Sequence, residues 1–203
     1  MRAPVRIAVF VSGGGTNFQA LIDYEKAGKL KNGSLALCLS SNPNAYALER
    51  ARAAGIPTAV VSRKDTAGQA DFEERILACL RENGIELIVL AGFMSILSES
   101  FTRQYEKRII NVHPSLIPSF CGKGFYGLRV HEEALRYGVK VTGATVHFVN
   151  EIADGGEIIF QKAVPIYKND TPERLQRRVM ERAEWKLLPR AAEAVAANIR
   201  KGK

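Results

Sequence analysis

The sequence predicts an α/β fold: a doubly wound, mostly parallel sheet of the Rossmann-like kind, with antiparallel strands and a long helix at the C-terminal end. In the first half, short apolar runs alternate with segments of helical periodicity, as they do in repeated βα units. In the second half, two strand-like runs are joined by a short glycine-containing turn, which indicates an antiparallel pair. A long helical pattern closes the chain.

The first half of the chain is predicted to alternate strands with helices. Residues 5–11 form a continuous apolar run, which is typical of a parallel strand buried on both faces. Further strands are expected at residues 35–39, 58–61, 87–90 and 109–112. Helices are expected at residues 17–26, 45–54, 70–81 and 98–105, and Ser98 is a suitable N-cap for the last of them.

The second half is predicted to hold an antiparallel pair of strands and two helices. The strands are expected at residues 141–149 and 158–166, and the helices at residues 130–137 and 172–199. The sequence contains no internal repeat, no low-complexity segment and no linker. We therefore expect a single domain that spans residues 1–203.

Composition excludes several classes of protein. A hydrophobic fraction of 46% and a charged fraction of 25% are typical of a soluble globular protein, and no apolar run is long enough to span a membrane. The start of the chain lacks a signal-peptide pattern, so we expect a cytoplasmic location and no membrane partner. The net charge is +8, but no basic patch interleaved with aromatic residues indicates a nucleic-acid partner.

The cysteine and histidine patterns indicate neither disulfides nor a metal. Cys38, Cys79 and Cys121 are widely separated and odd in number, so a disulfide framework or a zinc site is not expected. Three scattered histidines without a His-Glu-x-x-His motif give no metal site. No Gly-x-Ser-x-Gly motif is present, which argues against a serine hydrolase.

A glycine-rich loop follows the first predicted strand. Gly13, Gly14 and Gly15 let the backbone turn sharply, and the helix behind them offers free N–H groups to an anion. The loop lacks the Gly-Lys-Ser/Thr ending of a P-loop, and Phe18 stands where a dinucleotide fingerprint needs a small residue. The pattern favours a monophosphate site, and the alternative is a tight turn without a ligand.

Two polar residues, Asn111 and His113, lie at the end of the fifth predicted strand. Asn111 and His113 are two residues apart, so their side chains point to the same face of the sheet. An amide beside an imidazole suits the stabilisation of an oxyanion during acyl transfer, although a polar strand end without chemistry is an equal alternative. The Ile117–Pro118 bond can be cis or trans. By itself, Asp154 with its two following glycines is typical of a hairpin turn.

Five segments together carry a resemblance that covers nearly the whole chain. They are VSGGGTN at residues 11–17, LAGFM at 90–94, NVHPSLIP at 111–118, VHFV at 146–149 and DGG at 154–156. In this order and spacing they resemble the phosphoribosylglycinamide formyltransferase family. Each segment alone is weak, and their combination is specific.

The resemblance implies a reaction and a catalytic group. A formyl group would pass directly from 10-formyltetrahydrofolate to the amine of glycinamide ribonucleotide, through a tetrahedral intermediate, in purine biosynthesis. The family match implies Asn111, His113 and Asp154 as the catalytic residues. Asn111 and a protonated His113 would donate hydrogen bonds to the formyl oxygen, and Asp154 would raise the pKa of His113 and help move the proton of the amine.

The resemblance also implies two binding regions and no metal. Residues 1–110 would form the phosphate-binding half, and residues 111–203 the catalytic and folate-binding half. The phosphate and ribose would be bound by Gly15, Thr16, Asn17 and Glu184. The folate co-substrate would be bound by Leu90, Met94, Ser95, Ile96, Leu97, Asn111 and Val149.

The chain departs from the family pattern at three places. Ser95 stands where many members carry an arginine, so a contact to the glutamate tail of the folate is in question. The segment before Glu184 lacks the usual glutamine and is one residue longer. The loop of residues 121–128 is longer than in some members, and we hypothesise that it is a mobile flap over the site.

Several alternatives stay open at this stage. A 10-formyltetrahydrofolate hydrolase would use water in place of the amine, and a non-catalytic phosphosugar-binding module would need only the glycine loop. Methionyl-tRNA formyltransferases have a similar segment around Asn111 and His113, but normally carry a further C-terminal domain. The partners are expected to be two small molecules, glycinamide ribonucleotide and formyl folate, and the chain is expected to be a monomer or a homodimer.

Overall fold

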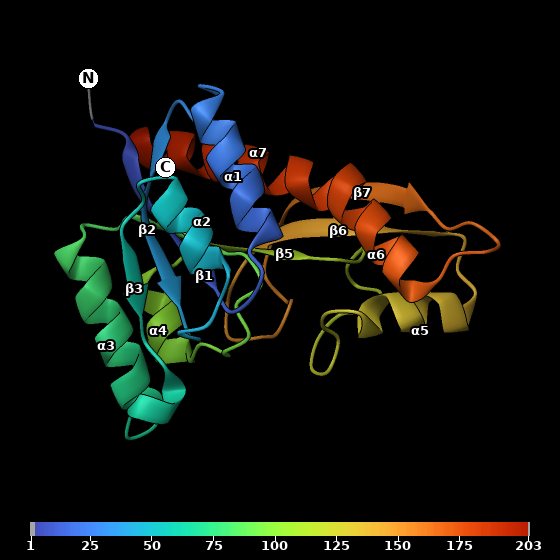
Figure 1. Cartoon of the computed structure of the whole chain (residues 1–203), viewed down its shortest axis with the longest axis horizontal. Coiled ribbons are helices and arrows are strands. Elements are labelled where there is room, and N and C mark those ends of the chain that lie inside the picture. The colour runs from blue at the N-terminus through green and yellow to red at the C-terminus, as the bar shows by residue number, and fades with distance from the viewer. Residues whose placement is uncertain (1–2, 203) are drawn as a thin grey trace.

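The computed structural model describes residues 3–202 and contains one seven-stranded sheet in the order β3-β2-β1-β4-β5-β6-β7. The strands from β1 to β5 run parallel, and β6 and β7 continue the sheet antiparallel to β5 (Figure 1). The predicted mixed sheet is therefore confirmed. The strands are β1 (Val5–Val11), β2 (Gly33–Ser40), β3 (Thr58–Val60), β4 (Leu87–Leu90), β5 (Ile109–His113), β6 (Val141–Phe148) and β7 (Ile158–Pro165).

Helices cover both faces of the parallel part of the sheet. One face carries α1, α2 and α7, and the other carries α3 and α4. The helices are α1 (Thr16–Lys26), α2 (Ala47–Ala53), α3 (Gln69–Glu82), α4 (Glu99–Gln104), α5 (Arg129–Tyr137), α6 (Pro172–Val179) and α7 (Trp185–Arg200). Their boundaries agree with the predicted ones to within two residues, apart from the irregular turn in the last helix.

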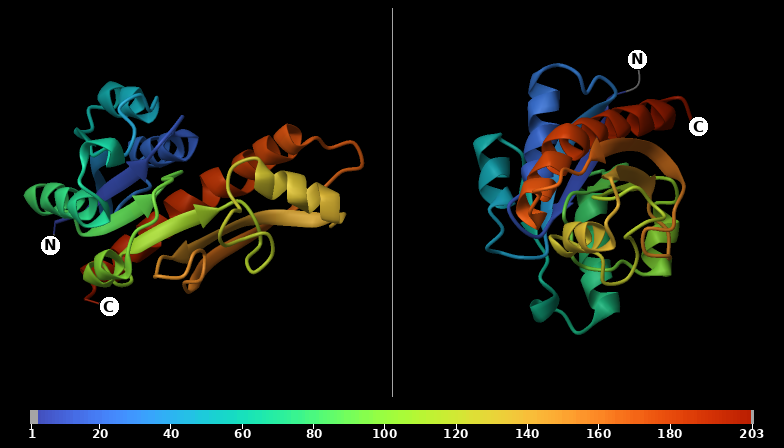
Figure 2. Two further views of the ribbon diagram at one scale, coloured as in Figure 1. Left: turned by 90° about the horizontal axis from the view of Figure 1, so that it is seen from below. Right: turned by 90° about the vertical axis from the view of Figure 1, so that its right-hand side faces the viewer.

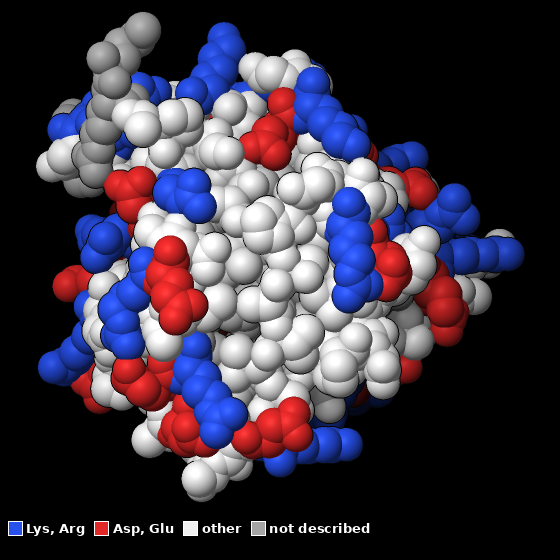
Figure 3. Space-filling model, turned by 60° about the vertical axis from the view of Figure 1, so that its left-hand side comes forward, with Lys and Arg blue, Asp and Glu red and all other residues white. Residues whose placement is uncertain are grey.

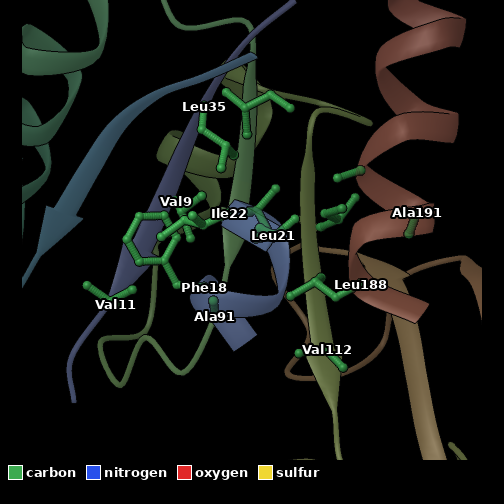
Figure 4. Packing of buried hydrophobic residues seen from close by; sticks show 14 of the residues in the cluster. Val9, Val11, Phe18, Leu21, Ile22, Leu35, Ala91, Val112, Leu188 and Ala191 are labelled. Carbon is green, nitrogen blue, oxygen red and sulfur yellow. The ribbon is translucent and has the colours of Figure 1, made fainter. Parts of the chain in front are cut away.

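The core explains why β1 reads as an unbroken apolar run. Val9 and Val11 pack with α1 and α7 on one face, while Phe10 packs with α3 and α4 on the other. In Figure 4, side chains from β1, α1, β5 and α7 meet in one buried layer that includes Phe18 and Leu188. Burial on both faces makes β1 the rigid centre of the sheet, and the loop that follows Val11 starts from a fixed point.

The last predicted helix is not regular throughout. A π-helical turn, Met180–Glu184, joins α6 to α7, so the predicted long C-terminal helix is confirmed and contains one irregular turn. A π turn accommodates one extra residue within a continuous helix. This turn lies in the segment for which the sequence predicts one extra residue relative to the family pattern. In Figure 2, α6 and α7 run along β6 and β7 as one long element.

Candidate active site

The glycine loop joins β1 to α1 at the carboxyl edge of the parallel strands. Gly15 is the N-cap of α1 and has a left-handed backbone with φ of 70°, which a residue with a side chain rarely adopts. A Cβ atom there would lie 2.6 Å from the Cβ of Ala47, whereas positions at Gly13 and Gly14 face open space. No side chain caps α1, so its first N–H groups are free to bind an anion.

The π turn brings Glu184 to the first turn of α1. Asn17 Nδ2 donates a hydrogen bond of 2.6 Å to Glu184 Oε2, although the two residues are far apart in the sequence. Burial raises the pKa of Glu184 to about 7 against the lowering effect of the Asn17 hydrogen bond. Asn17 Oδ1 is buried and has no hydrogen-bond partner among the described residues, so its capacity to accept a bond is unused.

The strand β5 and the loop after β6 supply the predicted catalytic residues. His113 Nδ1 lies 3.4 Å from Asp154 Oδ2, and the two side chains are only 5% and 14% exposed. His113 Nε2 donates a hydrogen bond of 2.8 Å to the carbonyl oxygen of Phe120. Because a carboxylate and a carbonyl only accept hydrogen bonds, both ring nitrogens of a protonated His113 would be matched.

The pKa of His113 is set by opposing effects. Burial lowers it below its ordinary value, and the neighbouring His147 adds to this effect. The charge of Asp154 and the Phe120 carbonyl act in the expected, raising direction, but they do not offset the loss of hydration. Asp154 thus acts in the predicted direction, but burial makes the net direction a lowered pKa for the protein without substrates.

Asp154 is ionised in a largely enclosed position. It has a left-handed backbone with φ of 56°, and its Oδ2 accepts a hydrogen bond of 2.8 Å from Gly122 N–H. Burial acts to raise its pKa, but the His147 hydrogen bond, the His113 charge and the Gly122 N–H together lower it. The same carboxylate thus contacts His113 and the loop of residues 121–128.

His147 is a site residue that the sequence argument overlooked. It lies opposite Asn111 in the β5–β6 pairing, and its Nε2 is 3.3 Å from Asn111 Nδ2 and 3.5 Å from Asp154 Oδ1. Its Nδ1 donates to the Phe148 carbonyl at 2.8 Å, so Nε2 of a neutral His147 can accept from Asn111, whereas Nε2 of a protonated His147 can donate to Asp154. Antiparallel pairing of the fifth and sixth predicted strands is the signal that could have found it.

His131 lies in the first turn of α5 and is fully buried. Neither ring nitrogen has a hydrogen-bond partner in the described part of the chain. Burial lowers the pKa of His131 to about 4, and the charge of His113 adds to this. We therefore regard His131 as a neutral neighbour of the site.

The predicted folate residues come from the end of β4 and the loop after it, from β5, and from the residue after β6. Leu90 is paired with Asn111 in the β4–β5 register, and Leu97 and Val149 pack in the same apolar cluster as Leu90. The side chains of Met94 and Ile96 are instead 58% and 72% exposed. The structure thus brings Leu90, Leu97 and Val149 together as an apolar wall. Met94 and Ile96 can present mainly their backbone groups to a ligand. Ser95 between them is half-buried.

The segment after β5 is irregular. The Ile117–Pro118 bond is cis, which resolves that alternative. Residues 121–128 form no helix or strand, and three glycines there have positive φ angles. Nothing in the structure tests whether this loop moves, so the flap stays a hypothesis.

Charge does not gather into one basic field on the face drawn in Figure 3, where acidic and basic side chains are interspersed around an area without charged groups. No helix among residues 3–202 is long and apolar enough to cross a membrane. In the same residues, no group of three or more histidine, cysteine or acidic side chains is arranged to bind a metal ion.

The fold and the site together define a Rossmann-like α/β enzyme with an amide, an imidazole and a carboxylate beyond the carboxyl end of β5. The chain belongs to the formyl transferase family, whose model matches residues 5–192. The phosphoribosylglycinamide formyltransferase of Haemophilus influenzae is 39% identical over 91% of this chain and 84% of its own length. The crystal structure of phosphoribosylglycinamide formyltransferase from Brucella melitensis has a TM-score of 0.88 and 42% identity, covering 96% of this chain and 97% of that chain.

A further relative is much longer. The trifunctional purine biosynthetic protein adenosine-3 of Gallus gallus is 44% identical over 95% of this chain, which spans only 18% of that protein. The resemblance inferred from the five motifs is thus confirmed by relatives of both kinds.

Proposed function

We propose that this protein transfers a formyl group from 10-formyltetrahydrofolate to the primary amine of glycinamide ribonucleotide. The observation that carries the proposal is the contact of His113 with Asp154 at the carboxyl edge of the sheet. The free N-terminus of α1 and the apolar wall of Leu90 lie at the same edge, in a chain with relatives named phosphoribosylglycinamide formyltransferase. Parallel α/β sheets bind their ligands at this edge.

The nucleotide side of the proposed site is the start of α1. The backbone N–H groups of Gly15 and Thr16, together with the positive end of the helix, suit a monophosphate. Asn17 Oδ1 and the buried Glu184 offer acceptors for the hydroxyl groups of a ribose. A tight βα turn without a ligand would not need a buried, unpartnered amide oxygen at this place.

The folate side fits a flat, mostly apolar ring system. Leu90, Leu97 and Val149 supply an apolar wall, and the backbone of residues 94–97 supplies polar groups at its edge. When it is bound here, the folate supplies the formyl group as a co-substrate. Ser95 gives this loop no positive charge, so the glutamate tail of the folate would find no cation at this position.

Asn111 and His113 act as hydrogen-bond donors to the oxygen of the formyl group. One N–H of the Asn111 amide points to His147, which fixes the orientation of the amide and leaves its second N–H for the substrate. Negative charge develops on the formyl oxygen as the amine attacks, and pre-oriented donors stabilise that charge. His147 is therefore a positioning residue for Asn111.

To bind the formyl oxygen, His113 has to give up its hydrogen bond to the Phe120 carbonyl. Its Nε2 donates to the Phe120 carbonyl, and its Nδ1 faces Asp154. A developing oxyanion is a stronger acceptor than a neutral carbonyl, so it can take the N–H that Phe120 accepts in the protein without substrates. Negative charge on the substrate also favours the protonated imidazole and acts against the effect of burial.

Asp154 accepts the proton that leaves the attacking amine. Its lowered pKa keeps it a carboxylate at neutral pH, within contact distance of both His113 and His147. Transfer to the leaving folate nitrogen would complete the proton balance, directly or through water. We place the reaction in the cytoplasm, which the free thiols of Cys38, Cys79 and Cys121 support.

A turnover assay with 10-formyltetrahydrofolate, run with and without glycinamide ribonucleotide, tests the proposal. We expect tetrahydrofolate and formylated nucleotide only when the acceptor is present. Release of tetrahydrofolate without the acceptor would instead indicate a hydrolase. A His113→Ala variant should lose turnover but retain nucleotide binding by calorimetry, whereas a non-catalytic phosphosugar-binding module would show no turnover before or after the change.

A further inference from the structure

The ends of three adjacent strands meet at one hydroxyl group. Ser12 directly follows β1, the central strand of the order β2-β1-β4. Its Oγ lies 2.7 Å from Ser41 Oγ, which directly follows β2, and it accepts a hydrogen bond of 3.0 Å from the N–H of Met94, which lies beyond β4. The Ser12 hydroxyl thus bridges the loops on both sides of β1.

The backbone around Ser12 is itself well supported. Ser41 N–H donates to the Val11 carbonyl at 3.2 Å, and Asn42 Nδ2 donates to the Ser12 carbonyl at 3.3 Å. Val11 is fully buried in the core. The position of the Ser12 side chain is therefore set by the sheet, and it can serve as a fixed point for a less regular segment.

The segment it contacts is the predicted folate loop. Residues 91–98 contain no helix or strand, and Met94 and Ile96 are largely exposed. Packing restrains this loop at Ala91, Phe93 and Leu97, so hydrogen bonds are needed to define the exposed backbone from Met94 to Ile96.

The opposite end of the loop has its own anchor on α3. Gln69 Nε2 donates to the Ile96 carbonyl at 3.0 Å, and the buried Glu73 accepts from Ser98 N–H at 2.6 Å and from the Ser98 hydroxyl. Only the Met94 end is attached to the strand that also leads into the glycine loop. Ser12 therefore lies between the two predicted substrate loops, one residue before Gly13.

We infer that Ser12 is a positioning residue for folate binding, although it lies in the segment that leads to the nucleotide phosphate. The inference rests on the proposed function, because it assigns Ser12 to one of its two substrates. Without the hydroxyl, Met94 N–H loses its acceptor and the loop backbone gains alternative conformations. The bound folate must then reorder it, whereas the glycines and the start of α1 keep their geometry.

The test is a comparison of kinetic constants for Ser12→Ala and the unmodified protein. Loss of one hydrogen bond predicts a KM for 10-formyltetrahydrofolate that is raised about three- to tenfold. The KM for glycinamide ribonucleotide should change less than twofold. The opposite split, a raised KM for the nucleotide alone, would show that Ser12 supports the phosphate loop and would overturn the inference.

Three further variants separate positioning from folding. Ser12→Thr keeps the hydroxyl and should restore the folate KM to within about twofold of the unmodified value. Ser41→Ala removes only the second partner of Ser12, so its effect should be smaller than that of Ser12→Ala. Ser34→Ala, at the opposite end of β2 and without a recorded side-chain hydrogen bond, should change neither KM.

A binding measurement removes the dependence on turnover. Calorimetric titration with tetrahydrofolate, the expected product, should show a dissociation constant raised by the same three- to tenfold in Ser12→Ala. Equal dissociation constants for both proteins would overturn the inference even if the unmodified enzyme is active. No turnover and no tetrahydrofolate binding by the unmodified protein would instead contradict the proposed function itself.

Discussion

Two glycine-rich loops border the candidate active site, and they differ in what their glycines are for. In the loop before α1, Gly15 has a positive φ and also lies against Ala47, so a side chain would be both strained and blocked. In the loop of residues 121–128, Gly122 and Gly127 have positive φ angles but face open space. The first loop is part of the packed fold, while the second is restrained by its backbone preferences, a few hydrogen bonds and the contact of the Phe125 ring with Phe120.

The two loops are therefore expected to control different properties, the first loop the stability of the fold and the second loop the rate of turnover. The first loop follows a buried strand and precedes a helix that packs in the core, so a change there should affect the folded state. The second loop contacts the site through the Gly122 N–H, which binds Asp154, and the Phe120 carbonyl just before the loop accepts from His113. A change there should affect turnover and leave the free energy of unfolding nearly constant.

The strongest test of this separation is Asp154→Asn, which removes the charge that links the second loop to the catalytic histidine. The amide cannot accept a proton from the amine or stabilise a protonated His113, so we expect kcat to fall about 10²- to 10³-fold. The free energy of unfolding, measured by urea titration, should change by less than about 1 kcal/mol because asparagine has the same shape and its amide oxygen can still accept from Gly122 N–H. A large loss of stability would show that the carboxylate is structural.

Glu184→Gln tests the buried contact behind the first loop, through the pH dependence of the free energy of unfolding. The pKa of Glu184 is raised to about 7, so its neutral form stabilises the folded state fully below its unfolded pKa of about 4.5, and this stabilisation is lost as pH rises through about 7. Between about pH 5.5 and pH 8 the unmodified protein should lose about 2 kcal/mol of stability relative to the glutamine variant. Urea titrations of both proteins at the two pH values measure this, and parallel pH profiles would contradict a neutral, buried Glu184.

The regular part of the molecule could be predicted because its signals are local. The apolar run of β1 and the glycines before α1 report backbone geometry and two-sided burial, both of which are written in consecutive residues. Alternation on a single strand predicts that Asn111 and His113 share one face of the sheet, and the family resemblance adds their catalytic role. Asp154 needed the family resemblance, because its sequence neighbours alone describe a turn.

What could not be predicted depends on contacts between distant segments. His147 belongs to the site only because β6 pairs antiparallel with β5, and Asn17 meets Glu184 only because a π turn absorbs one extra residue. The net direction of the His113 pKa depends on burial, which exceeds the effect of the carboxylate expected to dominate. The balance between burial and charge at His113 can be judged only from the three-dimensional structure.

A matched pair of glycine substitutions sharpens the comparison within the first loop. Gly15→Ala combines left-handed strain with a contact of 2.6 Å to Ala47, so the protein should lose about 2 kcal/mol of stability. Its Tm should fall by about 4–8 °C in a calorimetric scan. Gly13→Ala meets no atom within 4 Å and should change the stability by less than about 0.5 kcal/mol. Equal losses would show that the loop is not packed as described.

The corresponding substitution in the second loop is Gly122→Pro. We expect it to have the smallest effect of these variants and to lower turnover rather than stability. Proline has no N–H to donate to Asp154 and cannot adopt the φ of 86°, so the carboxylate loses one charge-assisted hydrogen bond. We expect kcat to fall about tenfold and Tm to stay within about 2 °C, since no apolar side chain is packed on Gly122.

Gly127→Pro is the matched control for this last prediction. Gly127 also has a positive φ and faces open space, but it makes no recorded contact with Asp154. If the N–H to the carboxylate is what matters, Gly127→Pro should keep kcat within about threefold of the unmodified value, because strain in an exposed loop can relax locally. Equal tenfold losses in both variants would instead show that turnover depends on the conformation of the whole loop, and the hydrogen bond to Asp154 would then be incidental to its role.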